Sequence, residues 1–385
     1  MAARRMRRAE EKLMRRAYRT ELHVNNTEQD LLMRCAGAAR FVFNWALADR
    51  ISRRERREKT NKFEQKRRFN ALKGSQYPWL YDLPYTIVEA EFDHLDVAFK
   101  NFFRRVKQGE PPGFPQFKDR RHQSFTLRGA LTVETGRIKL PKLGWLRLAE
   151  SGYLPTAEVK ILFVTLSLET DHWMISLQVE EADKPTPRHE PDRLAVHLGV
   201  AKLATLSNGR QFENPKNLLR YEKKLAHLQR GLSRKELGSQ NRRKAKLAVA
   251  KCHRRISNTR RFALHEVSHY VAKHSKAHKI IIQDFHVQEM VEGVPVSHDL
   301  NKRIHDAAMG ELRRQVQYKA TWQGKEVVLV PQEAPVSQRC SNCGTLNTDL
   351  KLGQRSWECP VCGTTHDREW NAIANLLHFS EIGTK

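Results

Sequence analysis

Two pairs of cysteines near the end of the chain constrain its fold more than any other feature. They form two C-x2-C turns separated by fifteen residues, and the four residues are Cys340, Cys343, Cys359 and Cys362. Each turn is typical of a knuckle that directs two sulfurs at one ion, and a glycine follows each knuckle, where the backbone must turn sharply. Two knuckles complete a tetrahedral shell, so the pattern predicts a structural zinc ion with no coordination position open for catalysis. The alternative is two disulfides or free thiols, but no apolar signal segment directs the chain to an oxidising compartment.

The charge balance predicts a polyanionic partner. The chain has 69 Lys and Arg residues against 43 Asp and Glu residues, which gives a formal net charge of +26. An excess of this size is typical of proteins that bind nucleic acid. The alternative is a merely soluble surface, but such surfaces normally mix both signs. No apolar run approaches membrane-spanning length, so we expect no membrane partner and a cytoplasmic protein associated with the nucleoid.

The first half of the sequence predicts a β domain with helices inserted in it. The Arg-rich segment 1–17 is expected to be a basic arm that contacts phosphates, or an extension before the true start of the protein. Residues 18–24 alternate like an edge strand, residues 26–29 resemble a helix cap, and helices are expected over 30–53 and 85–106. Short strands are predicted between Phe117 and Val179. The large aromatic residues of the two helices are expected in the core rather than stacked on bases; they are Phe41, Trp45, Phe99 and Phe102.

A Pro-rich linker at 184–191 separates this half from a predicted α/β domain. Buried strands are expected at 194–199, 203–212, 279–285 and 325–330. A long helical segment rich in Lys and Arg follows the second of these strands, at 217–271, and a further helix is expected around 306–318. Strands that alternate with helices indicate a mixed sheet.

Several segments, taken together and in order, resemble the TnpB family. These are RNA-guided nucleases of bacterial insertion-sequence transposons, related to type V CRISPR effectors. The segments that carry the resemblance cover nearly the whole chain; besides the four cysteines, they are Ala38–Leu47, Ala98–Phe103, Gly113–Lys118, Leu198–Gly209, Arg255–Arg261 and Asp367–Ala372.

The resemblance implies an α+β multidomain fold. A wedge-type β-barrel domain is expected from 18–36 and 107–183, after a basic arm at 1–17, with a helical recognition lobe inserted at 37–106. After the linker, a RuvC/RNase H-like α/β domain is expected from 192–338 and 364–385, interrupted by a zinc ribbon at 339–363.

The chain departs from its family at the three positions where the resemblance implies catalytic carboxylates. The family's first acid lies in a motif like G-I-D-L-G, the second in I-E-D and the third in D-R-D-x-N-A. The corresponding residues here are His197, Gln283 and Glu369. RuvC chemistry needs several carboxylates to hold two divalent ions, and only Glu369 keeps a charge. Nearby acids do not compensate: Asp284 and Asp192 have the wrong strand parity, and Asp367 is better placed to cap a helix that begins near Arg368.

These substitutions predict that DNA cleavage is lost and that no Mg2+ is held at the RuvC site. The alternative is a slip in the correspondence or an acid repositioned from elsewhere. Because the zinc cysteines, buried strands and basic helices are intact, a repurposed binder is favoured over a decaying relic. The resemblance is then closest to nuclease-dead TnpB-like repressors, which use a guide RNA to occupy promoter DNA.

In such a protein, base pairing between guide and target reads the sequence, and the protein holds the heteroduplex through its backbone. We therefore expect a monomeric ribonucleoprotein with a guide RNA encoded near the gene and with target double-stranded DNA as its partners. The basic side chains expected to line the channel, rather than a merely solvated helix face, are Lys223, Lys224, Arg242, Arg243, Lys244, Arg254, Arg255, Arg260 and Arg261. The resemblance implies that a short adjacent motif in the DNA is read from the helix that carries Tyr85, Thr86, Glu89 and Lys100.

Two other functions stay open from the sequence. One is an active RNA-guided RuvC endonuclease with an atypical site. The other is a zinc-ribbon DNA-binding accessory of transposition that needs no guide.

Overall fold

The chain divides into two compact units, Met1–Asp183 (unit 1) and Lys184–Lys385 (unit 2). The computed structural model describes residues 13–156, 159–182, 193–284, 298–351 and 353–382. The predicted linker at 184–191 lies outside the described residues, as do the first twelve residues of the predicted basic arm. Within the described ranges, none of the helices combines the length and the apolar character needed to span a bilayer.

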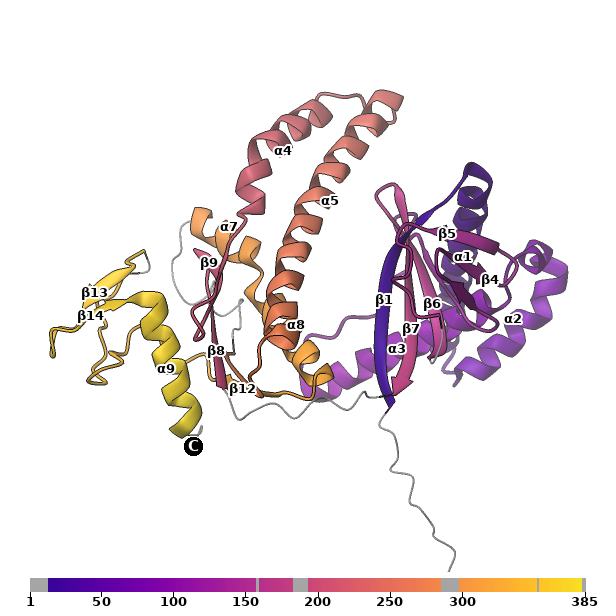
Figure 1. The fold of residues 1–385 in the computed structure, drawn as a ribbon. Helices are drawn as coiled ribbons and strands as arrows, with labels where there is room; N and C mark the ends of the chain where they lie inside the picture. The colour runs from indigo at the N-terminus through magenta and orange to yellow at the C-terminus, as the bar shows by residue number, and fades with distance from the viewer. Residues whose placement is uncertain (1–12, 157–158, 183–192, 285–297, 352, 383–385) are drawn as a thin grey trace, which may run out of the picture. The chain divides into compact units, whose positions relative to one another are not determined.

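Unit 1 is built on a seven-stranded antiparallel sheet in the order β2-β6-β7-β1-β5-β4-β3 (Figure 1). Its strands are β1 (Leu13–His23), β2 (Ser124–Leu127), β3 (Thr132–Glu134), β4 (Arg137–Leu140), β5 (Gly144–Leu148), β6 (Lys160–Glu169) and β7 (His172–Ala182). Period-2 alternation gives the sheet one buried face; in β4, for example, Ile138 and Leu140 are buried while Arg137 and Lys139 are exposed. Among the described strands, β2 and β3 each have one neighbour, so a closed barrel stays a prediction.

The expectation of an edge strand at 18–24 is wrong. Strand β1 begins at Leu13 and pairs with β7 on one side and with β5 on the other. Residues 13–17 therefore belong to the sheet and not to a basic arm. Alternation along a strand reports which face is buried, but it says nothing about whether neighbouring strands pair with both edges, and this explains the error.

Three α-helices and one 3-10 helix follow or cover this sheet: α1 (Asn26–Glu55), α2 (Lys62–Gln76), η1 (Pro78–Asp82) and α3 (Thr86–Gln108). A capping box between Asn25 and Glu28 starts α1, one residue before the predicted cap. Because α1 is unbroken to Glu55, the predicted boundary between 36 and 37 falls inside a helix. Helix α2 lies in a stretch for which the sequence predicted no element. The aromatic side chains predicted to be internal are in the core or pack against it, which confirms that prediction.

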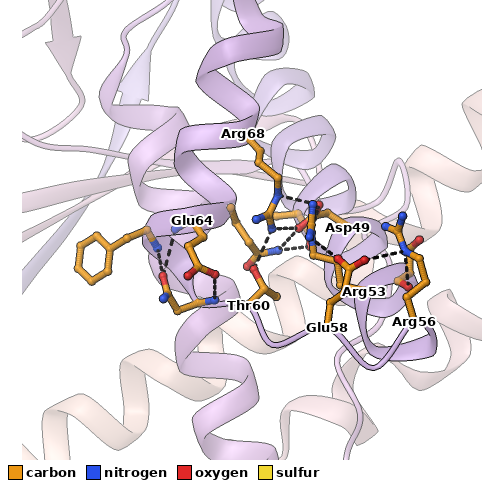
Figure 2. A network of polar contacts seen from close by, with 12 residues as sticks. Asp49, Arg53, Arg56, Glu58, Thr60, Glu64 and Arg68 are labelled. Atoms are coloured by element: carbon orange, nitrogen blue, oxygen red, sulfur yellow. Dashed lines mark hydrogen bonds and ion pairs between the residues drawn. The ribbon is translucent and has the colours of Figure 1, made fainter.

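A network of charged side chains joins α1 to α2 (Figure 2). The Asp49 carboxylate on α1 accepts hydrogen bonds from Arg68 at 2.6 and 3.2 Å, from Gln65 at 3.0 Å and from Arg53 at 3.2 Å. Burial alone would raise the pKa of Asp49, but these donors outweigh burial and hold the pKa below its ordinary value. One carboxylate therefore fixes the angle between the two helices.

Unit 2 is built on a five-stranded mixed sheet in the order β10-β9-β8-β11-β12. Its strands are β8 (Arg193–Leu198), β9 (Lys202–Leu206), β10 (Gln211–Glu213), β11 (Lys279–Gln283) and β12 (Glu326–Val330), close to the predicted positions. Strand β8 runs parallel to β11, and β11 runs parallel to β12. Leu194, Val196, Ile280 and Ile282 lie in one apolar core, and Ala195 and Ile281 lie in another on the opposite face.

The helices of unit 2 cover both faces of this sheet. They are α4 (Asn217–Ser233), α5 (Gln240–His269), α7 (His298–Ala307), α8 (Met309–Trp322) and α9 (Arg368–Ile382), with a π-helical turn η2 (Tyr270–His274) after α5. Helices α5 and α8 pack on the first face and α9 on the second. The segment 217–271 is two helices side by side rather than one (Figure 1), because the chain reverses at 234–239 around Gly238 with φ of +85°.

A single buried carboxylate ties three of these helices together. Asp306 on α7 accepts from the backbone N–H of Leu218, in the first turn of α4, at 2.9 Å. It also accepts from the Arg260 guanidinium of α5 at 2.6 and 3.2 Å. A negative charge at a helix N-terminus is stabilising, so Asp306 anchors the base of the α4–α5 hairpin.

We predict that Asp49→Asn destabilises unit 1 by about 1–3 kcal/mol at pH 7, because buried donors lose a charged acceptor. Since the folded-state pKa of Asp49 is lowered, its contribution is present above the unfolded pKa and is lost as pH falls through the folded value. The loss relative to wild type should therefore shrink below about pH 4. Calorimetric unfolding of the full chain at several pH values measures this. Glu58→Gln, which removes a more exposed member of the same network, is the control and should change stability much less.

Candidate functional site

The four predicted cysteines converge on one point. Their sulfurs lie within 4.8 Å of one another, with Cys340 Sγ 3.7 Å from Cys362 Sγ and Cys343 Sγ 3.5 Å from Cys359 Sγ. Gly344 and Gly363 follow the knuckles in the left-handed region, with φ of +83° and +67°, as predicted. Because tetrahedral zinc–thiolate shells have this size, the four sulfurs could hold a metal ion such as zinc.

Polar groups around Cys343 and Cys362 lower the pKa of these two thiols, whereas burial raises the pKa of Cys340 to about 11. Hydrogen bonds from Thr364 lower the pKa of the Cys362 thiol to about 5. The buried His366 ring places Nε2 3.0 Å from Cys340 Sγ and packs against Trp357. His366 lies on β14 (Thr365–Asp367), which pairs with β13 (Ser356–Glu358). This imidazole supports the cluster, and the cysteine spacing alone did not predict its role.

The ribbon is fastened to α9 by two buried asparagines. Asn371 Nδ2 donates to the carbonyl of Arg339 at 2.8 Å, and its Oδ1 accepts from the N–H of Ser341 at 3.0 Å. Asn375 Nδ2 donates to the carbonyls of Arg339 at 2.6 Å and Val336 at 2.9 Å. The cysteine knuckle at 340 and the first turn of α9 are therefore held as one piece.

The three positions implied by the resemblance also converge. His197 and Gln283 lie at the carboxyl ends of the neighbouring parallel strands β8 and β11, on the face covered by α9. Glu369 lies in the first turn of α9, and its Oε2 is 3.4 Å from His197 Nε2. All three are more than nine-tenths buried and line one pocket of about 670 Å³. The three residues therefore lie together, and their correspondence to the family's carboxylates stays a prediction.

The charges in this pocket differ from those of a metal-binding carboxylate cluster. Burial, with Arg368 and Arg355 adding to it, lowers the pKa of His197 to about 4, so its imidazole is neutral near pH 7. Burial also raises the pKa of Glu369, against the opposing effect of Arg355. Arg355, which directly precedes β13, donates to Glu369 Oε1 at 3.1 Å. The only carboxylate at these three positions therefore already has a cation beside it.

Gln283 is held by its amide nitrogen. This nitrogen donates to the carbonyls of Gln332 at 3.1 Å and Ala334 at 3.0 Å, in the segment that follows β12. Two other acids line the same pocket, and each is paired with a cation: Asp306 with Arg260 and Glu222 with Lys302. Asp284 turns to the other face and pairs with Arg313 of α8, as the strand parity predicted. Asp192 lies outside the described residues.

Asp367 caps α9, which confirms the predicted role. Its Oδ1 accepts from the N–H groups of Glu369 at 2.9 Å and Trp370 at 3.1 Å, and α9 begins at Arg368. This carboxylate is therefore used by the helix terminus rather than by the pocket.

This donor set does not fit Mg2+, which requires several charged oxygen ligands in near-octahedral geometry. One neutral imidazole, one amide and one carboxylate paired with arginine supply a single shared charge. Other walls of the pocket add further cations, including Lys216 and Lys302, the latter paired with Glu222 at 2.9 Å.

Most of the predicted nucleic-acid residues lie on the α4–α5 hairpin with exposed side chains. The exposed ones are Lys223, Lys224, Arg243, Lys244, Arg255 and Arg261. Arg254 is half-buried. Arg242 caps α4 by donating to the carbonyls of Leu232 and Lys235, and Arg260 binds Asp306, so both also have structural partners. The sequence could not show these two partners because each depends on how α4 and α5 meet their neighbours.

The helix expected to read the adjacent motif presents only part of the predicted set. Tyr85 and Lys100 are exposed, with Lys100 paired to Asp96 at 2.9 Å. Glu89 is half-buried and paired with Lys66. Thr86 is buried under Arg128, whose N–H lies 3.4 Å from its hydroxyl, so it cannot contact DNA. The prediction for Thr86 is wrong because its position in the first turn of α3 faces the core.

Comparisons with known proteins agree with this architecture. Family profiles described as "Cas12f1-like, TNB domain", "Probable transposase" and "Helix-turn-helix domain" match residues 310–376, 176–293 and 14–59. The last range forms strand β1 and helix α1 here. The chain is 35% identical over 381 residues to "Putative RNA-guided DNA endonuclease InsQ" of Escherichia coli (strain K12), covering 94% of this chain and 91% of that protein. It is 31% identical to "Putative RNA-guided DNA endonuclease" of Streptomyces pristinaespiralis, covering 94% and 89%.

A solved structure shows a similar fold. The Cas12f1 protein in a cryo-EM structure of the Cas12f1–sgRNA–target DNA complex superposes with a TM-score of 0.57 at 12% identity, covering 94% of this chain and 98% of that one. The two relatives show that the chain belongs to the TnpB family of transposon-encoded proteins, and both are named "Putative RNA-guided DNA endonuclease".

We predict about one zinc ion per purified chain, bound by the four cysteines. Cys359→Ala should abolish this zinc and lower the thermal stability of unit 2, because a three-sulfur shell binds much more weakly. Elemental analysis by mass spectrometry measures the metal content. Cys252→Ala, which removes a buried thiol of α5, is the control and should keep its zinc. Zinc retained by Cys359→Ala would contradict the assignment.

Proposed function

We propose that this protein is an RNA-guided DNA-binding protein that does not cleave its target and represses transcription by occupying promoter DNA next to a short adjacent motif. The observation that supports this most strongly is the pocket formed by His197, Gln283 and Glu369. Asp306 and Glu222 also line this pocket, and each pairs with a cation, but of the three positions at which the family resemblance implies carboxylates only one carries a carboxylate, Glu369. That carboxylate faces a neutral imidazole and a guanidinium.

The charge argument for lost cleavage is simple. A two-metal site brings a charge of about +4 into one pocket, and buried cations need compensating anions or they do not bind. Here Glu369 supplies one negative charge, and Arg355 offsets it at 3.1 Å. A divalent ion would first have to displace this arginine and would then meet two neutral ligands.

The remaining framework supports retained binding of nucleic acid. The α4–α5 hairpin presents six exposed basic side chains of the predicted set, and buried contacts such as Arg260–Asp306 fix its base. The cysteine cluster and its asparagine anchors are complete. In a guided protein, base pairing supplies the sequence specificity, so cleavage is not required for stable occupancy of one DNA site.

Repression follows from stable occupancy. A heteroduplex of guide and target strand, held through phosphates by a strongly basic protein, would block a polymerase at a promoter. The guide, encoded near the gene, would select that promoter. Zinc would have a structural part only, and no Mg2+ would be needed for binding.

Purification and a binding assay test this proposal. We expect the protein to co-purify with one defined structured RNA and the complex to shift matched duplex DNA in a native gel. The same DNA should remain uncut on a denaturing gel with Mg2+ or Mn2+, because the pocket lacks the charge to hold the ions. DNA that does not match the guide is the control. Guide-dependent cutting would instead support an atypical endonuclease, and binding without any defined RNA would support a guide-independent accessory of transposition.

A second prediction concerns the pocket itself. Electron paramagnetic resonance should detect no Mn2+ bound to wild-type protein at concentrations up to about 1 mM, since only one paired carboxylate faces the ion. The triple variant His197→Asp, Gln283→Glu, Glu369→Asp should bind Mn2+ at least roughly tenfold more tightly than wild type. Glu381→Gln, an exposed acid near the end of α9, is the control and should bind as wild type does. Tight Mn2+ binding by wild type that Glu369→Gln abolishes would contradict the loss of the metal site.

A further inference from the structure

The outer face of the unit 1 sheet is divided into two regions with different charge pairing. On β1, β6 and β7 the charges that face outward form ion pairs, such as Arg15 with Glu180 at 3.1 Å and Arg19 with Glu169. On β4 and β5, the same face carries Arg137, Lys139, Trp145 and Arg147, which we call the Trp145 platform. Here Arg147 has no hydrogen-bond or ion-pair partner among the described residues, and neither does the ammonium group of Lys139.

Strand register places these four side chains together. Arg137 lies opposite Arg147, and Lys139 lies opposite Trp145, so all four point to the face away from the core. The alternate residues Ile138, Leu146 and Leu148 are buried on the other face. The platform is therefore carried by a rigid hairpin rather than by a loop.

The platform combines an aromatic surface with cations. The Arg137 guanidinium lies 4.4 Å from the centre of the Trp145 ring, and Lys139 Nζ lies 5.9 Å from it. Trp145, Arg137 and Arg147 border an open concavity of about 720 Å³, which Thr135 and Thr156 also help to line. With the guanidinium over the indole ring, the pair presents a flat cationic surface on which a base can stack.

The two acids that line the concavity are already used by neighbours. Glu134 accepts from Arg137 at 2.6 Å, and Glu28 accepts from the N–H of Asn25 at 2.8 Å in the capping box of α1. Glu28 keeps its negative charge, so Arg137, Lys139 and Arg147 together exceed the two acids by one positive charge. A flat aromatic surface with unpaired cations at its edge is complementary to a base and its flanking phosphates, and it is a poor match for an apolar or basic peptide.

We propose that the Trp145 platform binds an unpaired nucleotide of an RNA strand, with the base stacked on the Trp145–Arg137 pair and the flanking phosphates at Arg147 and Lys139. An unpaired nucleotide is required because the bases of a duplex are stacked on one another and cannot reach a flat ring. The inference rests on the proposed function only in naming the guide RNA as the natural source of that nucleotide.

Photo-crosslinking gives a local readout, which is needed because a chain with a net charge of +26 also binds oligonucleotides elsewhere. The full-length protein, freed of nucleic acid in high salt, is irradiated with a 15-nucleotide oligouridylate that carries 4-thiouridine. Trypsin cuts after Lys142 and Arg147, so Trp145 is released in the short peptide Leu143–Arg147. We expect a uridine adduct on this peptide. Trp145→Leu should reduce the yield of labelled 143–147 peptide at least about fivefold, and Trp145→Phe should keep most of it.

Salt dependence tests the cations independently. Arg147→Gln and Lys139→Gln should each lower the slope of log affinity against log salt by about 0.7, as expected for one lost contact with a single-stranded phosphate. Arg15→Gln, on the same face but paired with Glu180, should leave the slope unchanged. Trp370→Leu, which removes an exposed indole of unit 2, should leave the crosslink on Leu143–Arg147 unchanged. Thermal unfolding of each variant establishes that it is folded.

The outcomes separate this inference from the proposed function. Absence of an adduct on Leu143–Arg147, or an adduct with the same yield in Trp145→Leu as judged on the intact protein, overturns the platform. A stronger adduct with the matching 4-thiothymidine DNA than with RNA overturns the RNA assignment. A defined RNA that co-purifies and directs DNA binding without contacting this peptide leaves the guided function standing and the platform wrong. An adduct at Trp145 in a protein that co-purifies with no defined RNA leaves the platform standing and the guided function wrong.

Discussion

The parallel pairing of β8 with β11 is the constraint on which the candidate site depends. With Val196 opposite Ile282, the two strands end at the same edge of the sheet, and their last inward side chains lie side by side. Helix α9 then packs on that face through Ala372, Ile373 and Leu376 and brings its first turn over the strand ends. Any residues placed at 197, 283 and 369 would meet. The fold therefore fixes where the site is, and the residue types alone decide what it can do.

The motif Asp367–Ala372, at the start of helix α9, has a structural role and also contributes to the pocket. Asp367 starts the helix, Asn371 holds the cysteine knuckle through the carbonyl of Arg339, and the buried Ala372 allows close packing on the sheet. Glu369 and the preceding Arg368 line the pocket. The structural part of the motif can thus persist while the chemical part changes, because the two parts use different faces of the same helical turn.

Much of this arrangement could be predicted from the sequence, because several signals are local. The cysteine spacing predicted the cluster, and the strand alternation predicted which face Asp284 occupies. The position of Asp367 predicted the helix cap. The errors concern tertiary partners. The pairing of β1 on both edges depends on strands far away in the sequence, and so does the burial of Thr86. The residues of each segment alone could not predict them. The sequence predicted Arg260 and Arg242 as phosphate contacts. In the fold, Arg260 binds Asp306 and Arg242 donates to carbonyls at the end of α4. The Trp145 platform depends on register across two strands, which the short strand pattern did not predict.

The charges of the residues at positions 197, 283 and 369 are compatible with one another in a buried pocket. Three buried carboxylates within one pocket repel unless cations neutralise them, so such a cluster makes the folded state depend on bound metal. With His197 neutral and Gln283 uncharged, only the charge of Glu369 has to be compensated, and Arg355 does so at 3.1 Å from the ribbon side. The amide of Gln283 meanwhile donates to the segment after β12, a contact that a carboxylate could not make. The unit 2 core can therefore be stable without a divalent ion.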